Sequence, residues 1–304
     1  MTDQVVYLYK SQRNDEAIND AVQKIFQNIP VNKDIDRIYI KPNLCYYWKA
    51  STGYTTDPML VSSIIDNIRI FYGDVDINII ESDASGMRTK YAFTMLGYKK
   101  LAEEKKVGLI NLSEVDQIKH KQNVANKEIS YSVPRILTEK NMLINVPKFK
   151  VMKQTHLTCA LKNIFGCISE PRKIKYHKYL DEAIVGINKI IKTDLVIVDG
   201  LVALSHHPFY MNMIMASNSA YSVDYTAAKI MGYDPNRINF LKIAERNGLG
   251  TSKNIKMMGE PISEFRFPKV NNLYSKYSFS LMLRMLGIYA KIVGDVIPPM
   301  LESE

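Results

Sequence analysis

The sequence predicts an α/β fold: a largely parallel sheet with helices on both faces. Short runs rich in Val, Ile, Leu and Tyr alternate with longer segments of helical period, and several of the short runs end in polar residues. This alternation is typical of βαβ units, in which each crossover helix packs back onto the sheet. The 304 residues, 46% of them hydrophobic, are enough for one large domain or for a domain with an appendage.

Strands are predicted where a short apolar run is bounded by polar or turn-forming residues. The runs are rich in β-branched and aromatic residues, as expected of buried strands. They lie at 5–9, 37–40, 77–80, 107–112, 142–146, 195–198 and 213–216. Ligands of such sheets bind beyond the carboxyl ends of the strands. The polar residues that follow these runs are therefore candidate site residues.

Helices are predicted between the strands, where apolar residues recur with helical period. They lie at 14–29, 58–71, 90–105, 181–191, 220–231 and 236–247. Pro58 fits the first position of its helix, because the N–H that proline lacks would be unpaired there in any case. Residues 1–270 are expected to form one α/β domain.

The segment 271–304 differs from the rest of the chain. Within it, 277–297 is dense in Leu, Met, Ile and Tyr, interrupted by Arg284, Lys291 and Asp295. This pattern favours an amphipathic helix that covers the core or docks on a partner. The alternative is a helix lying peripherally at the inner face of a membrane, because basic residues flank the apolar face.

Composition narrows the class of protein. Lys and Arg number 40 against 31 Asp and Glu, but the lysines are spread along the chain without an Arg-rich arm or zinc-finger spacing, which argues against a specific nucleic-acid binder. The odd count of 3 cysteines fits a reducing compartment. No secretory signal pattern is seen, and no apolar run reaches the roughly 18 residues of a membrane span. A cytoplasmic protein is expected.

The first polar cluster follows the strand at 37–40. A strand that runs through a loop into a helix N-terminus directs backbone N–H groups at an anion. Substrate binding is predicted for Lys41, Asn43, Thr55 and Thr56, the first by its charge and the threonines by their hydroxyls. The simpler alternative is that Thr56 or Asp57 only caps the helix and Lys41 points to solvent.

The second polar cluster follows the strand at 142–146. Lys148 and Lys150 alternate on an extended segment, so both should point the same way. Gathered cations without an anionic partner repel one another, which favours a carboxylate or phosphate ligand, or a lysine of lowered pKa that acts as a base. The alternative is a solvated basic face. Lys148 and Asn163 are predicted to bind substrate, and proton transfer is predicted for Lys150, His156, Lys162 and His177.

Two further candidates are weaker. Cys45, Cys159 and Cys167 lie in the two polar clusters, and three thiolates could hold an iron–sulfur cluster or a zinc ion. Their spacing matches no compact ligand motif, and free cysteines are commonly buried apolar residues. Asp83 ends a strand and could bind a substrate hydroxyl or a metal, although turns after strands also favour Asp for local hydrogen bonds.

These motifs resemble one known family in their order along the chain. The family is domain-of-unknown-function family 362, and the matching motifs are Lys41-Pro42-Asn43, Gly53-x-Thr55-Thr56-x-Pro58, Val146-Pro147-Lys148-x-Lys150, Thr158-x-x-x-Lys162-Asn163-x-Phe165-Gly166-Cys167 and His177. Many members carry a ferredoxin-like module, which implies redox chemistry. This sequence shows no such module, so electron transfer would need a separate redox partner or the three cysteines.

The resemblance has two departures. Family members usually have a histidine where Met152 stands, and His156 is the nearest substitute. The pattern is also similar, at the level of the fold, to the N-terminal part of lactate racemase-type enzymes. Their Gly-x-His segment would fall near 82–87, where this chain has no histidine. Racemase activity is therefore not expected.

The sequence favours an enzyme that acts on a small anionic metabolite, a carboxylate or a phosphate, by acid–base or redox-linked chemistry. A noncatalytic protein that binds an anionic ligand and docks through 277–297 is the first alternative. An iron–sulfur electron carrier that uses the three cysteines is the second. The cofactor, the substrate and the oligomeric state are not identified by the sequence.

Overall fold

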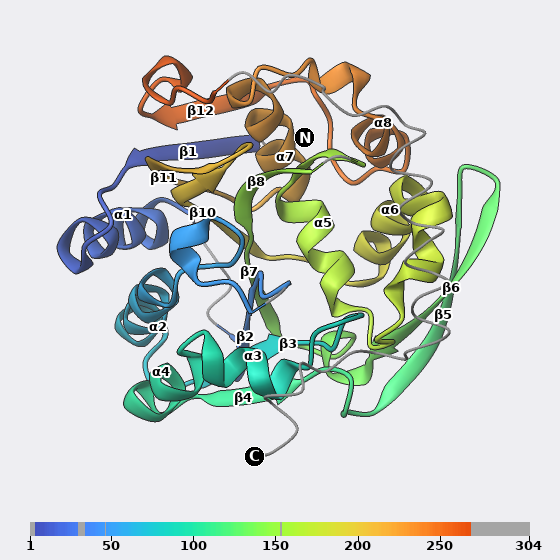
Figure 1. The fold of residues 1–304 in the computed structure, drawn as a ribbon, viewed down its shortest axis with the longest axis horizontal. Helices are drawn as coiled ribbons and strands as arrows, with labels where there is room; N and C mark the ends of the chain where they lie inside the picture. The colour runs from blue at the N-terminus through green and yellow to red at the C-terminus, as the bar shows by residue number, and fades with distance from the viewer. Residues whose placement is uncertain (1–3, 30–33, 46, 153, 269–304) are drawn as a thin grey trace.

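The computed structural model describes residues 4–29, 34–45, 47–152 and 154–268. Its main sheet has the strand order β12-β1-β11-β10-β7-β2-β3-β4 (Figure 1). The strands are β1 (Gln4–Lys10), β2 (Arg37–Pro42), β3 (Asp76–Glu81), β4 (Gly108–Asn111), β7 (Met142–Val146), β8 (Lys148–Met152), β9 (His156–Thr158), β10 (Leu195–Leu204), β11 (Pro208–Ser217) and β12 (Ile255–Gly259). β8 pairs with β10, and β9 pairs with β8.

The sheet is largely parallel, which confirms the predicted fold class. From β10 through β7, β2 and β3 to β4, neighbouring strands run parallel. β11 runs antiparallel to both of its neighbours, β1 and β10, and β12 lies parallel to β1 at the edge. The carboxyl ends of the parallel strands therefore meet along one edge of the sheet.

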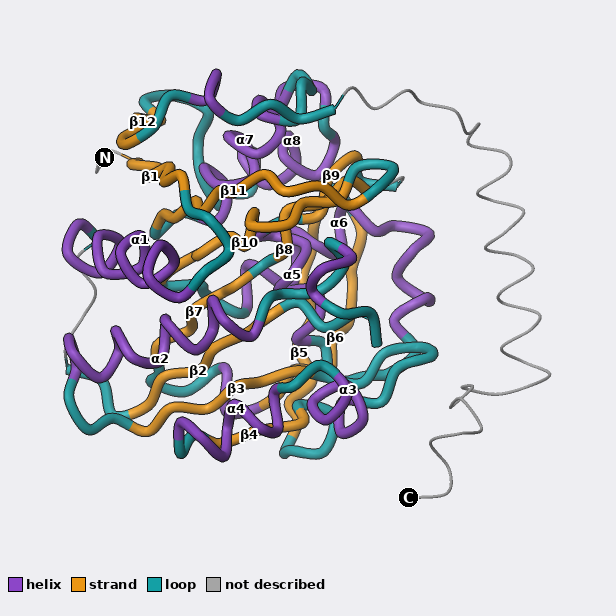
Figure 2. Tube along the Cα trace, turned by 60° about the vertical axis from the view of Figure 1, so that its left-hand side comes forward, coloured by secondary structure: helices purple, strands orange, loops and turns teal. Residues whose placement is uncertain are grey.

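Helices cover both faces of the sheet, and Figure 2 shows the strands passing between the two groups. One group consists of α1 (Asp15–Asn28), α2 (Pro58–Tyr72), α3 (Thr89–Met95) and α4 (Tyr98–Lys105). The other consists of α5 (Ala160–Ile164), α6 (Leu180–Ile190), α7 (Ala220–Ile230) and α8 (Asn239–Arg246).

Two hydrophobic cores result from the alternation of side chains along each strand. In β2, Ile38 and Ile40 face the core under the first helix group, whereas Tyr39 faces the core under the second. In β10, Ile197 and Val198 divide in the same way. Successive side chains of a strand point to opposite faces, so a strand buried on both faces is apolar throughout.

Local signals in the sequence set the helix starts near the future site. Asp57 is the N-cap of α2, where its Oδ1 accepts the N–H of Met59 at 3.1 Å, and Pro58 occupies the first turn. Asn14 caps α1 through the N–H of Ala17. Of the two residues considered as caps, Asp57 is the one that acts, which fixes the end of the loop that follows β2.

The structure differs from the sequence-based expectation in two elements, and a third expected element lies outside the described residues. The helix predicted at 90–105 is two helices, α3 and α4, because Gly97 between them has φ 83° and cannot continue a right-handed helix. The hairpin β5 (Gln117–Val124) and β6 (Lys127–Pro134) was not predicted, since its two-residue turn lacks the usual Asn-Gly pair. The predicted tail 277–297 lies outside the described residues. None of the helices within the described ranges has the length and apolar character needed to cross a membrane.

A close contact between hairpin and helix gives a stability prediction. A Cβ added to Gly186 in α6 would lie 2.1 Å from Oη of Tyr131 in β6 and 2.9 Å from its Cζ. Gly186→Ala should therefore lower the free energy of unfolding by about 2 kcal/mol through overpacking, although alanine alone favours a helix by about 1 kcal/mol. In a Tyr131→Phe background the same change should cost less. Equal costs in the two backgrounds, measured by urea denaturation, would contradict this account.

Candidate functional site

A buried ion pair joins the ends of β2 and β3. Nζ of Lys41 lies 2.8 Å from Oε2 of Glu81, and the two side chains are 1% and 5% exposed. The same carboxylate accepts the backbone N–H groups of Leu44 and Ser82, at 3.1 and 2.9 Å. The loop after each strand is thus tied to a charge that is neutralised inside the protein.

A second buried ion pair joins β8 and β10. Nζ of Lys148 lies 2.8 Å from Oδ2 of Asp199, and neither side chain is exposed. The carboxylate also accepts the backbone N–H groups of Asp57 and Leu201. Burial raises the pKa of Asp199 and Lys148 opposes that rise, so the pair is stable only as a unit.

Side-chain amides and hydroxyls close the space between these pairs. Asn163 of α5 donates to Oδ1 of Asn145 at 2.8 Å and accepts from Nδ2 of Asn43 at 2.9 Å. The hydroxyl of Thr56 donates to the carbonyl of Val146, and that of Thr55 to the carbonyl of Trp48. These groups bind protein partners, so their contacts are structural. Substrate binding stays a prediction for Asn43, Thr55, Thr56 and Asn163.

Lys150 is the first lysine of the region without a carboxylate partner among the described residues. Its ammonium donates to Oδ1 of Asn43 at 2.8 Å, to Sγ of Cys45 at 3.0 Å and to the carbonyl of Tyr54 at 2.8 Å. The side chain is 3% exposed. All three N–H groups are satisfied, but by dipoles and a thiol, so the positive charge is left uncompensated by any acidic side chain.

Lys162 is the second lysine of the region without a carboxylate partner among the described residues. In the described part of the chain its ammonium has neither a hydrogen-bond acceptor nor an ion-pair partner, and its side chain is partly exposed. Burial and the charge of Lys150 lower the pKa of Lys162 to about 8, and Cys45 acts in the opposite direction. Two neighbouring ammonium groups without a counter-charge form a site that attracts an anion.

Two polar atoms close to these lysines are buried and without a partner. Nδ1 of His177, in the 3-10 helix Lys173–Tyr179, has no hydrogen bond, and neither does Oγ1 of Thr158. Burial and then the Lys162 charge lower the pKa of His177 to about 4, so its imidazole is neutral near pH 7. Thr158 pairs with Lys150 across β8 and β9, which places both side chains on one face of that hairpin.

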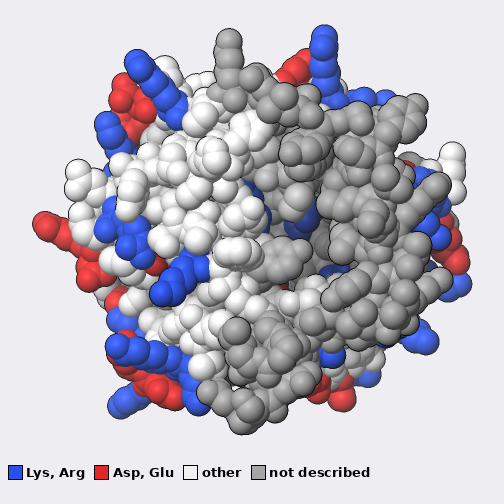
Figure 3. Space-filling view, viewed as in Figure 1, with Lys and Arg blue, Asp and Glu red and all other residues white. Residues whose placement is uncertain are grey.

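The face of the molecule drawn in Figure 3 is hollowed near its centre. Figure 3 shows Lys and Arg side chains at the floor of a recess near the centre of the face it presents. Trp48 and Tyr54 are exposed in the loop between β2 and α2, and their rings lie 5.9 Å apart. Nζ of Lys150 lies 5.9 Å from the centre of the Tyr54 ring. This loop therefore presents aromatic side chains beside the uncompensated charge.

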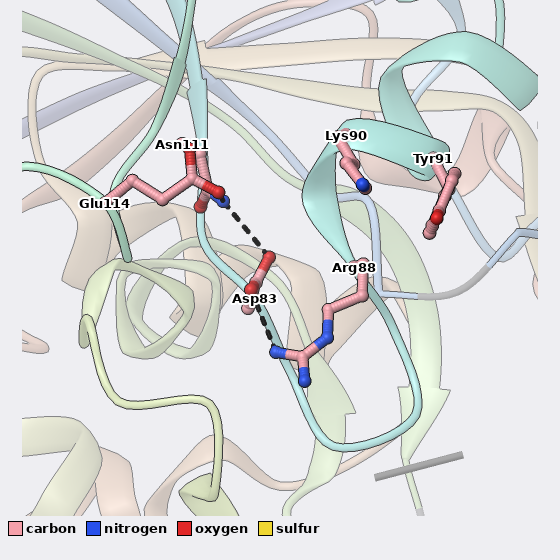
Figure 4. Close-up of a pocket in the computed structure, with 6 residues that line it drawn as sticks. All are labelled: Asp83, Arg88, Lys90, Tyr91, Asn111 and Glu114. Carbon is pink, nitrogen blue, oxygen red and sulfur yellow. Dashed lines mark hydrogen bonds and ion pairs between the residues drawn. The ribbon is translucent and has the colours of Figure 1, made fainter. Parts of the chain in front are cut away.

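The remaining candidates lie elsewhere or have other partners. His156 is exposed and its ring packs on Tyr233 at 5.4 Å. The carboxylate of Asp83 accepts from Arg88 at 3.1 Å and from Asn111 at 3.3 Å, in a separate pocket of about 270 Å³ (Figure 4). Thr158 ends β9 and α5 begins at Ala160, so Thr158 and Lys162 do not share a helix face.

The three cysteines have different surroundings. Cys45 is half-buried beside Lys150, whereas Cys159 and Cys167 are buried. Burial raises the pKa of both buried thiols, that of Cys167 to about 12. Within the described ranges, no group of three or more His, Cys, Asp or Glu side chains is placed to hold a metal ion.

Sequence reasoning did not find the partners of the lysines. Glu81 is the last residue of β3 and Asp199 lies within β10, and the position of each after a run of apolar strand residues was the available signal. Lys173 was not among the predicted site residues either. Its ammonium donates to Oγ of Ser82 at 2.8 Å, and burial lowers the pKa of Lys173 to about 8.

Removing one partner of a buried ion pair should lower the free energy of unfolding far more than removing one partner of a surface pair. Lys148→Met should lower the free energy of unfolding by about 3–5 kcal/mol, because Asp199 then stays buried without its counter-charge. The matched control is Arg37→Met, which removes the half-exposed pair with Asp76 and should cost at most about 1 kcal/mol. Both are measured by denaturant unfolding, and equal losses would contradict the structural role of Lys148.

Comparisons with known proteins identify one family and two partial similarities. A family model described as "Domain of unknown function (DUF362)" matches residues 38–229. The thylakoid-associated protein sll1697 of Synechocystis sp. is 30% identical over 122 residues, which are 36% of this chain and 38% of that protein, so the chain spans well under half of that relative. The lactate racemase apoprotein of Thermoanaerobacterium thermosaccharolyticum matches with a TM-score of 0.37 and 10% identity, over 80% of this chain and 56% of that one. Because the family model spans more than half of its residues, this chain belongs to the DUF362 family.

Proposed function

We propose that the protein is an enzyme that acts on a small anionic metabolite, a carboxylate or a phosphate, by transfer of a proton. The observation that carries the proposal is the Lys162 ammonium, which lacks a partner among the described residues and lies near the uncompensated charge of Lys150. Buried or half-buried charges are normally paired. An anion bound at Lys162 would supply the missing counter-charge.

The contacts divide the binding role between three side chains. Lys162 has free N–H groups and would contact the anion directly. Thr158 offers a buried hydroxyl without a partner, which a ligand oxygen can satisfy. Lys150 has already used its donors, so it contributes mainly through its positive charge.

His177 is the proposed proton acceptor. Its imidazole is held neutral by burial and by the Lys162 charge, which lower its pKa to about 4. An anion that neutralises Lys162 removes part of this effect, and the pKa of His177 then moves back toward the range in which proton transfer is efficient near neutral pH. The base is thus strengthened when the substrate is in place.

The test separates binding from chemistry. Small carboxylates and phosphates are titrated against the protein, with the fluorescence of Trp48, the one tryptophan of the chain, as the signal. Lys162→Met should weaken binding at least tenfold, since a hydrogen bond to a charged group contributes about 1.5–3 kcal/mol. Lys119→Met, on the exposed face of the β5–β6 hairpin, is the matched control and should not change binding.

The chemical role is measured on ligands that bind. In deuterated water, NMR should show the protein exchanging a carbon-bound proton of the substrate for deuterium. His177→Asn should retain binding and lose the exchange at least a hundredfold, as expected for removal of a general base. Binding that survives Lys162→Met would refute the assigned site, and exchange that survives His177→Asn would refute the assigned base.

Binding should also take up protons near pH 8. Free Lys162, with its pKa of about 8, is half protonated there, and a bound anion favours the charged form. About half a proton should therefore enter per ligand at pH 8, and far less at pH 6. Calorimetry of the His177→Asn variant in two buffers of different ionisation enthalpy measures this uptake without the protons that His177 would take up as its pKa rises. Lys162→Met should abolish it, and uptake that is equal at pH 6 and pH 8 would contradict the assignment.

A further inference from the structure

Cys45 differs from the other cysteines in both access and contacts. It is half-buried, whereas Cys159 and Cys167 are buried. Its Sγ accepts a hydrogen bond from the Lys150 ammonium at 3.0 Å and donates one to the carbonyl of Tyr54 at 3.7 Å. Reactive cysteines are found in such surroundings, beside a cation and partly exposed.

Lys150 is held in place against this sulfur. Its two other hydrogen bonds go to Oδ1 of Asn43 and to the carbonyl of Tyr54, both at 2.8 Å. Asn43 is itself fixed by Asn163. The ammonium is therefore oriented by buried groups, and its third N–H is left for the sulfur.

A second, independent feature beside Lys150 is a buried hydroxyl without a hydrogen-bond partner. The Thr158 side chain is 2% exposed, its hydroxyl has no partner, and it lies on the face of the β8–β9 hairpin from which Lys150 extends. Lys162, with its unpaired ammonium in the described chain, is influenced electrostatically by both Lys150 and Cys45. A polar ligand between these groups would satisfy the hydroxyl and the charge together.

We propose that Cys45 is a nucleophile of this site, held in contact with the Lys150 ammonium, and that it bonds covalently to small anions that carry an electrophilic carbon with a leaving group. In the step, the Cys45 thiol gives its proton to solvent, the Sγ–carbon bond forms, the bond from carbon to the leaving group breaks, and the leaving group departs with its electron pair. No oxidant or reductant is consumed. The inference rests on the proposed function, because the anion is the one bound at Lys162.

Iodoacetate and iodoacetamide test the two parts separately. Both alkylate a thiolate with loss of iodide, but only iodoacetate is an anion. Labelling of each cysteine is followed by peptide mapping, with Cys159 and Cys167 as unreactive internal references and Cys45→Ser as the negative control. Cys45 should react with iodoacetamide about tenfold faster at pH 7 than the cysteine of a short unstructured peptide does. Lys150→Met should remove this advantage, and Lys150→Arg should keep most of it.

The charge of the reagent reports on the anion site. The ratio of the iodoacetate rate to the iodoacetamide rate should be at least tenfold higher for Cys45 than for the peptide, and Lys162→Met should bring that ratio back toward the value of the peptide. Cys45 is not the proposed nucleophile if it reacts with iodoacetamide no faster than the peptide cysteine, or if Lys150→Met leaves its rate unchanged. A reactive Cys45 with the charge ratio of the peptide instead overturns the anion site, and the proposed function with it.

Discussion

The region beyond the strand ends depends on the neutralisation of lysine charges inside the protein. Lys41, Lys148 and Lys150 are 1%, 0% and 3% exposed, and an ammonium removed from water is costly unless opposite charge or strong dipoles surround it. Glu81 and Asp199 meet that requirement for two of them. The loops after β2 and β3 and the start of α2 are anchored on these carboxylates, so loop positions follow from where the charges pair.

The same requirement separates structural lysines from functional ones. Lys148 has a carboxylate partner and no exposed surface, so its charge is balanced inside the protein. Lys150 has only neutral acceptors, and Lys162 has none within the described chain. These two lysine charges lie close to two buried atoms without a partner, Oγ1 of Thr158 and Nδ1 of His177. The candidate site is therefore the region in which lysine charges and buried polar atoms lack partners among the described residues.

Much of the fold could be predicted from the sequence, because strands buried on both faces and amphipathic helices leave strong periodic signals. The convergence of polar residues at strand ends was predicted on the same basis. Which lysine pairs with which carboxylate could not be, since Lys41 and Glu81 are 40 residues apart and Lys148 and Asp199 are 51 apart. The β5–β6 hairpin was missed because its polar strands show little apolar alternation and its turn is not an Asn-Gly turn.

The chain of amides around Asn163 has a consequence for how the protein is assembled. Asn43 and Asn163 are separated by 120 residues, and Lys150 and Asn43 by 107. Contacts between such distant segments form only after large loops have closed, and the entropic cost of closure favours nearby contacts first. These contacts therefore require loops of 107 and 120 residues to close, and a chain that ends before α5 lacks Asn163, which fixes Asn43.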